Sequence, residues 1–287
     1  MAHGSIETIG VLGSGQMGAG IAQVAAQAGY RVLLADRDST VAEQGKMKIS
    51  GTLTKLVEKA KISEQESAQI LSRIEVVEGI SGLSKSDLAI EAATENQNLK
   101  FELFKKLDVA CTSKAYLVSN TSSISITQIA AQTMRPERVA GMHFMNPVPV
   151  MKLVEGIRGL QTSPETFSEV RVVAEKMGKT FVEARDFPGF IVNRILMPMI
   201  NEAVTTLHEG VASVEDIDAA MKLGTNQPMV PLALADFIGL DTCLAIMEVL
   251  HGGLGDSKYR PSPLLRQYVA AGWLGKKTGK GFYSYEL

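Results

Sequence analysis

One histidine in this chain, His143, closes an apolar run, and a glutamate, Glu155, follows it by twelve positions, beyond two prolines. Imidazole is the only side chain with an unperturbed pKa near neutrality, so His143 could take up or release a proton during a reaction. A carboxylate behind the ring would fix its tautomer and stabilise the imidazolium that forms. By residue type alone, a histidine at the end of an apolar run could equally be a hydrogen-bonded core residue. Other motifs must decide between these readings.

A second chemical motif is Gly13-Ser14-Gly15-Gln16-Met17-Gly18, which fits the pattern G-x-G-x-x-G. It follows the apolar run Thr8–Gly13 and opens the helix-like stretch Gln16–Gly29. The glycines of such a turn let the backbone approach a pyrophosphate, whose charge the helix N-terminus stabilises. The pattern therefore predicts a dinucleotide site, with the cofactor held by Gly13, Gly15, Gln16, Met17 and Gly18.

An acidic residue, Asp36, closes the next apolar run 23 positions after Gly13. This is near the ~20 positions expected for a carboxylate that accepts hydrogen bonds from ribose hydroxyls. A carboxylate repels a 2′-phosphate, so Asp36 favours NAD over NADP. The neighbouring Arg37 could bind such a phosphate, and NADP stays open as the less favoured cofactor.

Elements that would position these residues alternate along the first half of the chain. Buried-strand patterns with helix-like stretches between them occur at Thr8–Gly13, Arg31–Asp36, Asp87–Ala92, Tyr116–Asn120 and Arg138–Phe144. Such alternation predicts an α/β fold with a doubly wound, mainly parallel Rossmann-type sheet. His143 would then lie at the carboxyl end of a strand, where ligands of such sheets bind.

Two long polar helices show capping-box spacing. Thr40 with Glu43 and Ser63 with Glu66 each place a hydroxyl three residues before a glutamate. The sequence therefore predicts helix starts at both places.

The pattern changes near Asp186–Phe190, after which helical spacing replaces the strand signals. We expect an NAD-binding domain over residues 1–187 and an all-helical domain over 188–287. The helical stretch Ala233–Leu250 is more apolar than about 100 residues would bury alone, which favours a homodimer through this domain.

Composition excludes several classes of protein. The net charge of -2 argues against nucleic-acid or anionic-membrane binding, and no apolar run approaches the roughly 18 residues of a spanning helix. The N-terminal stretch 1–7 lacks the apolar core of a secretory signal. Cys111 and Cys243, the only cysteines, suggest neither a disulfide framework nor a metal site. We expect a cytoplasmic protein without a metal.

Four further motifs carry a resemblance to a known family. SNTSS (Ser119–Ser123), HFMNP (His143–Pro147) with Glu155, DFPGFIVNR (Asp186–Arg194) and GKKTGKGFY (Gly275–Tyr283) occur in order and at matching spacing. In these the chain resembles the L-3-hydroxyacyl-CoA dehydrogenase family, and most of all its stand-alone bacterial branch acting on 3-hydroxybutyryl-CoA. The likeness extends from about Glu7 to the C-terminus. Together these motifs favour an acid–base role for His143 over that of a core residue.

The resemblance implies a reaction. It is the reversible NAD-linked oxidation of a (3S)-hydroxyacyl-CoA to the 3-oxoacyl-CoA, with 3-hydroxybutyryl-CoA and acetoacetyl-CoA as the expected pair. His143 would be the acid–base group and Glu155 would orient it, while Ser122 and Asn193 would hydrogen-bond the substrate oxygens. The further residues expected beside the cofactor are Glu95, Lys100, Ser122, Asn146 and Lys277. Lys55, in a lysine-rich helix, is the candidate for binding the CoA moiety.

Position 230 departs from the family pattern. Val230 stands where glycine is common, and it would be strained if the backbone there required a positive φ. The following proline favours extended backbone, which valine adopts readily. As a hypothesis, Val230 alters the lining near the acyl group.

Three alternatives remain at this stage. They are a sugar-acid dehydrogenase of the L-gulonate type, a 6-phosphogluconate-type enzyme with lysine as the proton-transfer group, and a non-enzymatic NAD-binding protein. Absence of CoA binding would favour the first, and absence of turnover would favour the last.

Overall fold

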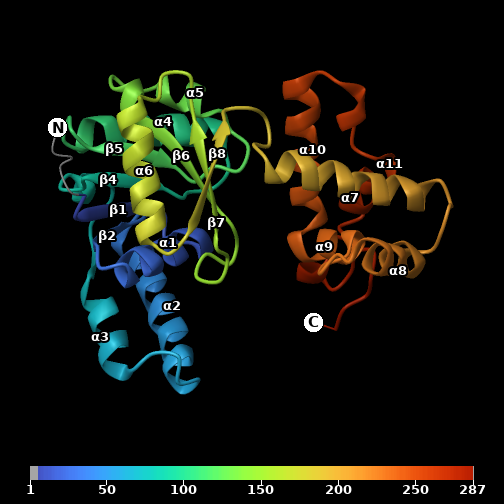
Figure 1. Cartoon of the computed structure of the whole chain (residues 1–287), viewed down its shortest axis with the longest axis horizontal. Helices are drawn as coiled ribbons and strands as arrows, with labels where there is room; N and C mark the ends of the chain where they lie inside the picture. The colour runs from blue at the N-terminus through green and yellow to red at the C-terminus, as the bar shows by residue number, and fades with distance from the viewer. Residues whose placement is uncertain (1–5, 287) are drawn as a thin grey trace. The chain divides into compact units, whose positions relative to one another are not determined.

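A computed structural model of the chain describes residues 6–286, so part of the N-terminal stretch considered above for a signal lies outside the described residues. The chain forms two compact units, Met1–Asp186 and Phe187–Leu287 (Figure 1). We keep 1–187 and 188–287 as the proposed domain assignment.

The first unit is built on one sheet with the strand order β3-β2-β1-β4-β5-β6-β7-β8. All neighbouring strands are parallel except β6 and β7, which pair antiparallel. The strands are β1 (Thr8–Leu12), β2 (Arg31–Ala35), β3 (Ile74–Val76), β4 (Leu88–Glu91), β5 (Tyr116–Ser119), β6 (Val139–Phe144), β7 (Leu153–Arg158) and β8 (Thr180–Arg185). The predicted doubly wound, mainly parallel sheet is confirmed.

Helices cover this sheet and connect its strands. They are α1 (Gln16–Gln27), α2 (Ser39–Glu58), α3 (Glu64–Ser72), α4 (Gln97–Ala110), α5 (Ile126–Ala130) and α6 (Pro164–Lys176), with short 3-10 turns at Ile80–Leu83 and Pro136–Arg138. Figure 1 shows α2 and α3 side by side, extending away from the sheet as a helical hairpin. The hairpin is attached through buried Ile49, Leu53 and Ile70, which belong to the same apolar core as the strands.

Local sequence explains the ends of this hairpin, with one correction. At α3, Ser63 and Glu66 form the predicted capping box. At α2 the prediction was wrong: the helix begins at Ser39, and the Asp38 side chain, not that of Thr40, accepts a hydrogen bond from the Val41 amide at 2.9 Å. Aspartate is a strong N-cap, and here it lies two positions before the threonine.

Among the residues that the structure describes, the named elements of the second unit are helices. They are α7 (Val192–His208), α8 (Val214–Thr225), α9 (Pro231–Ile238), α10 (Leu240–Leu254) and α11 (Pro263–Ala270), with 3-10 turns at Ser257–Tyr259 and Lys276–Thr278. A separate apolar core, which includes Met197, Leu232, Leu240 and Met247, holds these helices together. The predicted all-helical C-terminal part is confirmed.

Two buried carboxylates hold the C-terminal segment of this unit. Asp236 accepts hydrogen bonds from the amides of Phe282 and Tyr283, both at 2.9 Å. Asp218 accepts one from the Tyr283 hydroxyl at 2.8 Å, and burial together with that carboxylate raises the pKa of Tyr283. The motif Gly275–Tyr283 is thus part of the packing of the helical unit.

Over residues 6–286, no helix has both the length and the apolar character needed to cross a membrane. The same part of the chain has no group of three or more His, Cys, Asp or Glu side chains that could hold a metal ion.

Candidate active site

The glycine-rich turn lies between β1 and α1 and is tightly packed. Gly13 has φ +101°, and a Cβ added there would lie 2.7 Å from the carbonyl oxygen of Ala92. A Cβ on Gly18 would lie 1.8 Å from the Gly13 carbonyl oxygen, so only glycine lets α1 pack this closely on the turn. At Gly15, the N-cap of α1, an added Cβ would meet open space. The start of α1 is therefore accessible to an anionic group.

Asp36 follows β2 and lies beside this turn. Its carboxylate accepts hydrogen bonds from the Ser14 amide at 2.6 Å, the Ser14 hydroxyl at 2.7 Å and the Arg37 amide at 2.7 Å. Burial alone would raise the pKa of Asp36, but these hydrogen bonds and the Arg37 charge outweigh it and lower the pKa. The Arg37 guanidinium lies 3.4 Å from Asp38. Asp36 is thus an ionised acceptor held in place, which suits ribose hydroxyls and disfavours a 2′-phosphate.

A cavity of about 770 Å³ lies between Asp36 and α4. Gly13, Gly15 and Asp36 line one part of it, and Ala93 and Leu103 line another. The open space at Gly15, the acceptor at Asp36 and the size of this cavity fit the adenosine and pyrophosphate of a dinucleotide.

His143 and Glu155 face each other across the antiparallel strands β6 and β7. The register pairs the two residues directly, and Nδ1 of His143 lies 2.7 Å from Oε2 of Glu155. His143 is 6% exposed and Glu155 is fully buried. The carboxylate selects the tautomer with hydrogen on Nδ1, so Nε2 is the nitrogen through which the ring can exchange a proton.

Glu95 organises the loop that carries Ser122. One carboxylate oxygen, Oε1, accepts hydrogen bonds from the Thr121 hydroxyl at 2.6 Å, the Ser122 amide at 2.8 Å and the Ser123 amide at 3.1 Å. The loop follows β5, so Ser122 lies at the carboxyl edge of the sheet. Asn120, which sequence reasoning did not single out, accepts a hydrogen bond from the Phe144 amide at 2.9 Å and so joins this loop to the strand of His143.

Lys100, expected beside the cofactor, is fully buried in α4. Its Nζ donates to Oε1 of Glu91 at 2.6 Å and lies 3.4 Å from Oε2 of Glu95. Glu91 also accepts a hydrogen bond from the Ser119 hydroxyl at 2.6 Å. This network supports the loop of Ser122 through Glu95, and Glu91 was not singled out by sequence reasoning.

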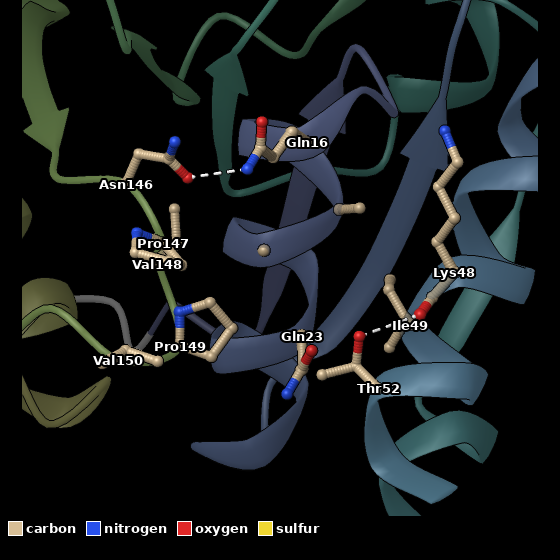
Figure 2. A pocket seen from close by; sticks show the side chains of 12 residues that line it. Gln16, Gln23, Lys48, Ile49, Thr52, Asn146, Pro147, Val148, Pro149 and Val150 are labelled. Carbon is tan, nitrogen blue, oxygen red and sulfur yellow. Dashed lines mark hydrogen bonds between the residues drawn. The ribbon is translucent and has the colours of Figure 1, made fainter. Parts of the chain in front are cut away.

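A second hollow of about 320 Å³, here the α1–α2 groove, lies between α1, α2 and the segment 146–150 (Figure 2). Gln16 and Asn146, both expected at the cofactor, line one end, and Nε2 of Gln16 donates to Oδ1 of Asn146 at 3.0 Å. Lys48 and Thr52 line the side formed by α2. Met17, next to Gln16, packs instead against the apolar core.

The remaining expected residues lie elsewhere. Lys55 is exposed on α2. In the second unit, Asn193 is buried in the first turn of α7. Lys277 lies in the turn Lys276–Thr278, and its Nζ is 2.6 Å from Oδ1 of Asp241. Val230 has φ −83° and ψ 151°, so it is extended and unstrained at the N-cap of α9.

These features define a class of protein. A doubly wound sheet, a glycine turn, an ionised acceptor after β2 and a buried histidine–carboxylate pair at the sheet's carboxyl edge are those of an NAD-dependent dehydrogenase.

Comparison with known proteins identifies the family. Residues 8–187 match the model of the 3-hydroxyacyl-CoA dehydrogenase NAD binding domain, and residues 189–285 match that of the 3-hydroxyacyl-CoA dehydrogenase C-terminal domain. The chain belongs to the 3-hydroxyacyl-CoA dehydrogenase family.

Individual relatives cover nearly the whole chain. It is 59% identical to a probable 3-hydroxybutyryl-CoA dehydrogenase of Bacillus subtilis, over 98% of each chain. It is 43% identical to human mitochondrial hydroxyacyl-coenzyme A dehydrogenase, over 98% of this chain and 92% of that one. The crystal structure of (S)-3-hydroxybutyryl-CoA dehydrogenase from Ralstonia eutropha matches with a TM-score of 0.97 and 50% identity, over 99% of this chain and 100% of that one.

Proposed function

We propose that the protein catalyses the reversible oxidation of (3S)-hydroxybutyryl-CoA to acetoacetyl-CoA with NAD. The observation that carries this proposal is the buried His143–Glu155 pair at the carboxyl end of β6, in a unit that also holds a dinucleotide site. Family membership supports the same reaction.

The proton is handled by His143. When bound, NAD supplies the carbon that accepts hydride from C3 of the substrate. As hydride leaves, the 3-hydroxyl proton passes to Nε2 of His143, and Glu155 stabilises the imidazolium across the 2.7 Å hydrogen bond. In the reductive direction the imidazolium returns this proton to the carbonyl oxygen. Acid–base catalysis of this kind contributes about 10²–10⁴ in rate, or roughly 3–5 kcal/mol of barrier.

The groups of the cofactor and the oxygens of the substrate are each assigned to residues of the expected site. We assign the pyrophosphate to the turn Gly13–Gly18 and the adenosine ribose to Asp36, while Glu95 and Lys100 order the loop beside the cofactor. Ser122 is the proposed donor to the 3-oxygen. Asn193 and Lys277, in the second unit, keep the roles that the family pattern implies, with substrate and cofactor respectively.

The CoA moiety is assigned to the α1–α2 groove. Lys48 lines this groove. Lys55 on α2 and Lys59 at its C-cap follow Lys48 by seven and eleven positions, a spacing that puts the three residues on one face of the helix. A stripe of cations on the groove side of the helix suits the phosphates of CoA. The thioester end would then point toward Asn146, three residues from His143.

Two further proposals concern assembly and compartment. Ile195, Leu223 and Phe237 in the helical unit are 67%, 84% and 55% exposed, and we infer that a homodimer covers such residues. Light scattering should give a mass near twice 30.8 kDa. Cys111 and Cys243 are both free and buried, which supports the proposed cytoplasmic compartment.

Oxidation of NADH by acetoacetyl-CoA tests the reaction, with NADPH measured in parallel. Wild-type protein should turn over with NADH, and His143→Ala should lose two or more decades of kcat/KM. Turnover of a free hydroxy acid without any turnover of the CoA ester would refute the proposed substrate class and leave the histidine's role intact.

A further inference from the structure

A side-chain hydrogen bond joins the glycine-rich turn to the segment 146–150 at one end of the α1–α2 groove. Nε2 of Gln16, the first residue of α1, donates to Oδ1 of Asn146 at 3.0 Å, across 130 positions of the chain. Figure 2 shows the two side chains directed toward each other, with this bond between them. Both residues line the groove and both are exposed, so a ligand can reach them.

The backbones that carry these two side chains are held in place. A Cβ added at Gly20, one turn beyond Gln16 on α1, would lie 2.8 Å from Cβ of Val148, so the helix and the segment pack closely. Val148 is 2% exposed, and its carbonyl oxygen accepts a hydrogen bond from Nζ of buried Lys179 at 2.5 Å. The bond between Gln16 and Asn146 therefore connects two ordered parts of the backbone.

The polarity of this bond determines which part of the Asn146 amide is left for a ligand. A primary amide has a carbonyl acceptor and an NH2 donor group, and a free asparagine side chain can present either of them. Because Gln16 donates to Oδ1, the remaining donors of Asn146 are those of Nδ2. Within residues 6–286 the Asn146 side chain has no other hydrogen-bond partner. Nδ2 is thus available to an acceptor on a ligand.

Two ligand groups with neutral oxygen acceptors are expected at this end of the groove. In the proposed function the thioester end of the substrate points toward Asn146, and its carbonyl oxygen accepts hydrogen bonds. The nicotinamide ribose of NAD follows the pyrophosphate, which is assigned to the turn that begins α1, and its hydroxyl oxygens are acceptors as well. An uncharged NH2 group suits either oxygen.

We propose that Gln16 is a positioning residue that turns the Asn146 amide so that Nδ2 donates to a neutral ligand oxygen, on the substrate thioester or on the nicotinamide ribose. This inference rests on the proposed function. Gln16 occupies one of the unspecified positions of the pattern G-x-G-x-x-G. Its side chain thus adds to the backbone role of the turn a second role, which acts through Asn146.

The test is a cycle of four proteins: wild type, Gln16→Met, Asn146→Ala and the double variant. Gln16→Met keeps the length of the side chain and removes the donor, so it should raise one KM about fivefold, the effect of losing one ordinary hydrogen bond. In the Asn146→Ala background the same replacement should have no further effect, because Gln16 acts through Asn146. A rise in the KM for acetoacetyl-CoA identifies the thioester as the acceptor, and a rise in the KM for NADH identifies the ribose.

A second variant reverses the polarity of the bond. In Gln16→Glu the carboxylate accepts hydrogen bonds and donates none, so Asn146 should turn Nδ2 toward position 16 and away from the ligand. The KM should then rise further than in Gln16→Met, and the effect of Gln16→Glu in the Asn146→Ala background gives the contribution of the added charge alone. Gln27→Met, at the exposed last residue of α1, is the matched control and should change neither KM.

Two results would overturn the proposal. One is an equal effect of Gln16→Met with and without the Asn146 side chain. The other is a lower melting temperature of Gln16→Met with both KM values unchanged, which is the pattern of a purely structural hydrogen bond. Absence of wild-type turnover with acetoacetyl-CoA would instead refute the proposed function. The same cycle of Kd values for acetoacetyl-CoA and NADH, measured by titration calorimetry, would then still decide the role of Gln16.

Discussion

Replacing Lys100 with methionine should destabilise the first unit far more than replacing its neighbour Lys105. Lys100 and Glu91 are both fully buried, and their charged atoms lie 2.6 Å apart. In Lys100→Met the carboxylate of Glu91 stays buried and loses its counter-charge, although the Ser119 hydroxyl still donates to it. Lys105, on the same helix, pairs with Glu102 at an exposed site.

The magnitude follows from desolvation. Removing one partner of a buried ion pair costs about 3–5 kcal/mol, because the remaining charge is left in a medium of low polarity. For a unit of this size each kcal/mol lowers the melting temperature by roughly 2–4 °C, so Lys100→Met should melt some ~6–20 °C below wild type. Exposed pairs contribute little, and Lys105→Met should melt close to wild type.

Calorimetry and urea unfolding of four proteins test this difference in stability. These are wild type, Lys100→Met, Lys105→Met and the double variant Glu91→Gln/Lys100→Met, which removes both charges and should regain most of the lost stability. Equal melting temperatures for Lys100→Met and Lys105→Met would refute the reasoning. The KM for NADH in the double variant then tests the cofactor role, since a rise of more than tenfold with stability restored would show that Lys100 acts on the cofactor directly.

Three further predictions follow from the site. Asp36→Asn should raise the Kd for NADH about tenfold, as measured by fluorescence titration. It should also reduce the difference between the Kd values for NADH and NADPH. Because the pKa of Asp36 is lowered in the folded protein, its contribution to stability is complete above the unfolded carboxyl pKa of about 3.9 and is lost as the pH falls through the folded value. Urea unfolding of wild type and Asp36→Asn should therefore converge only in acid, and convergence near neutrality would contradict this. Lys179→Met releases the carbonyl oxygens of Val148 and Met151 and should raise the KM for acetoacetyl-CoA about tenfold, with a smaller effect on the KM for NADH. Equal effects on both KM values would count against a role in the α1–α2 groove. Val230→Gly relieves no strain, since Val230 is already extended, so it should lower the free energy of unfolding in urea by ~0.5–1 kcal/mol. A gain in stability would contradict the absence of strain at this position. An unchanged preference for acyl chain length would contradict the hypothesis that Val230 alters the lining near the acyl group.

Sequence patterns sufficed for the elements whose residues are uniformly apolar. The strands β1, β2, β4, β5 and β6 are buried runs, and each was expected near its observed place. By contrast, β8 has only two buried residues, Phe181 and Ala184, among exposed ones, and β3 has only three residues, so neither formed an apolar run. The strand β7 follows two prolines, and only its Glu155 was singled out from the sequence.

The site residues also divide into those that a local sequence pattern locates and those that only the tertiary structure brings together. Gly13 and Asp36 belong to a pattern whose spacing is fixed by a local strand–turn–helix unit, so sequence alone could locate them. Pairing of Glu155 with His143 depends on the antiparallel register of β6 and β7, which needs a strand that the sequence did not reveal. Burial of Lys100 against Glu91 and the hydrogen bond between Gln16 and Asn146 are tertiary properties, and residue type gave no sign of either.

The antiparallel register of β6 and β7 also has a consequence for folding order. His143 and Glu155 are twelve positions apart and meet through one local reversal of the chain, whereas β1 pairs with β4 across 79 positions, Ile9 with Leu88. Contacts between residues close in sequence close small loops and form with a lower entropic barrier than distant parallel pairings. The proton-transferring half of the site is therefore expected to assemble early, from a hairpin. The half that binds the dinucleotide must wait for the long-range sheet, so a refolding chain should recover its histidine–glutamate pair before it can hold a cofactor.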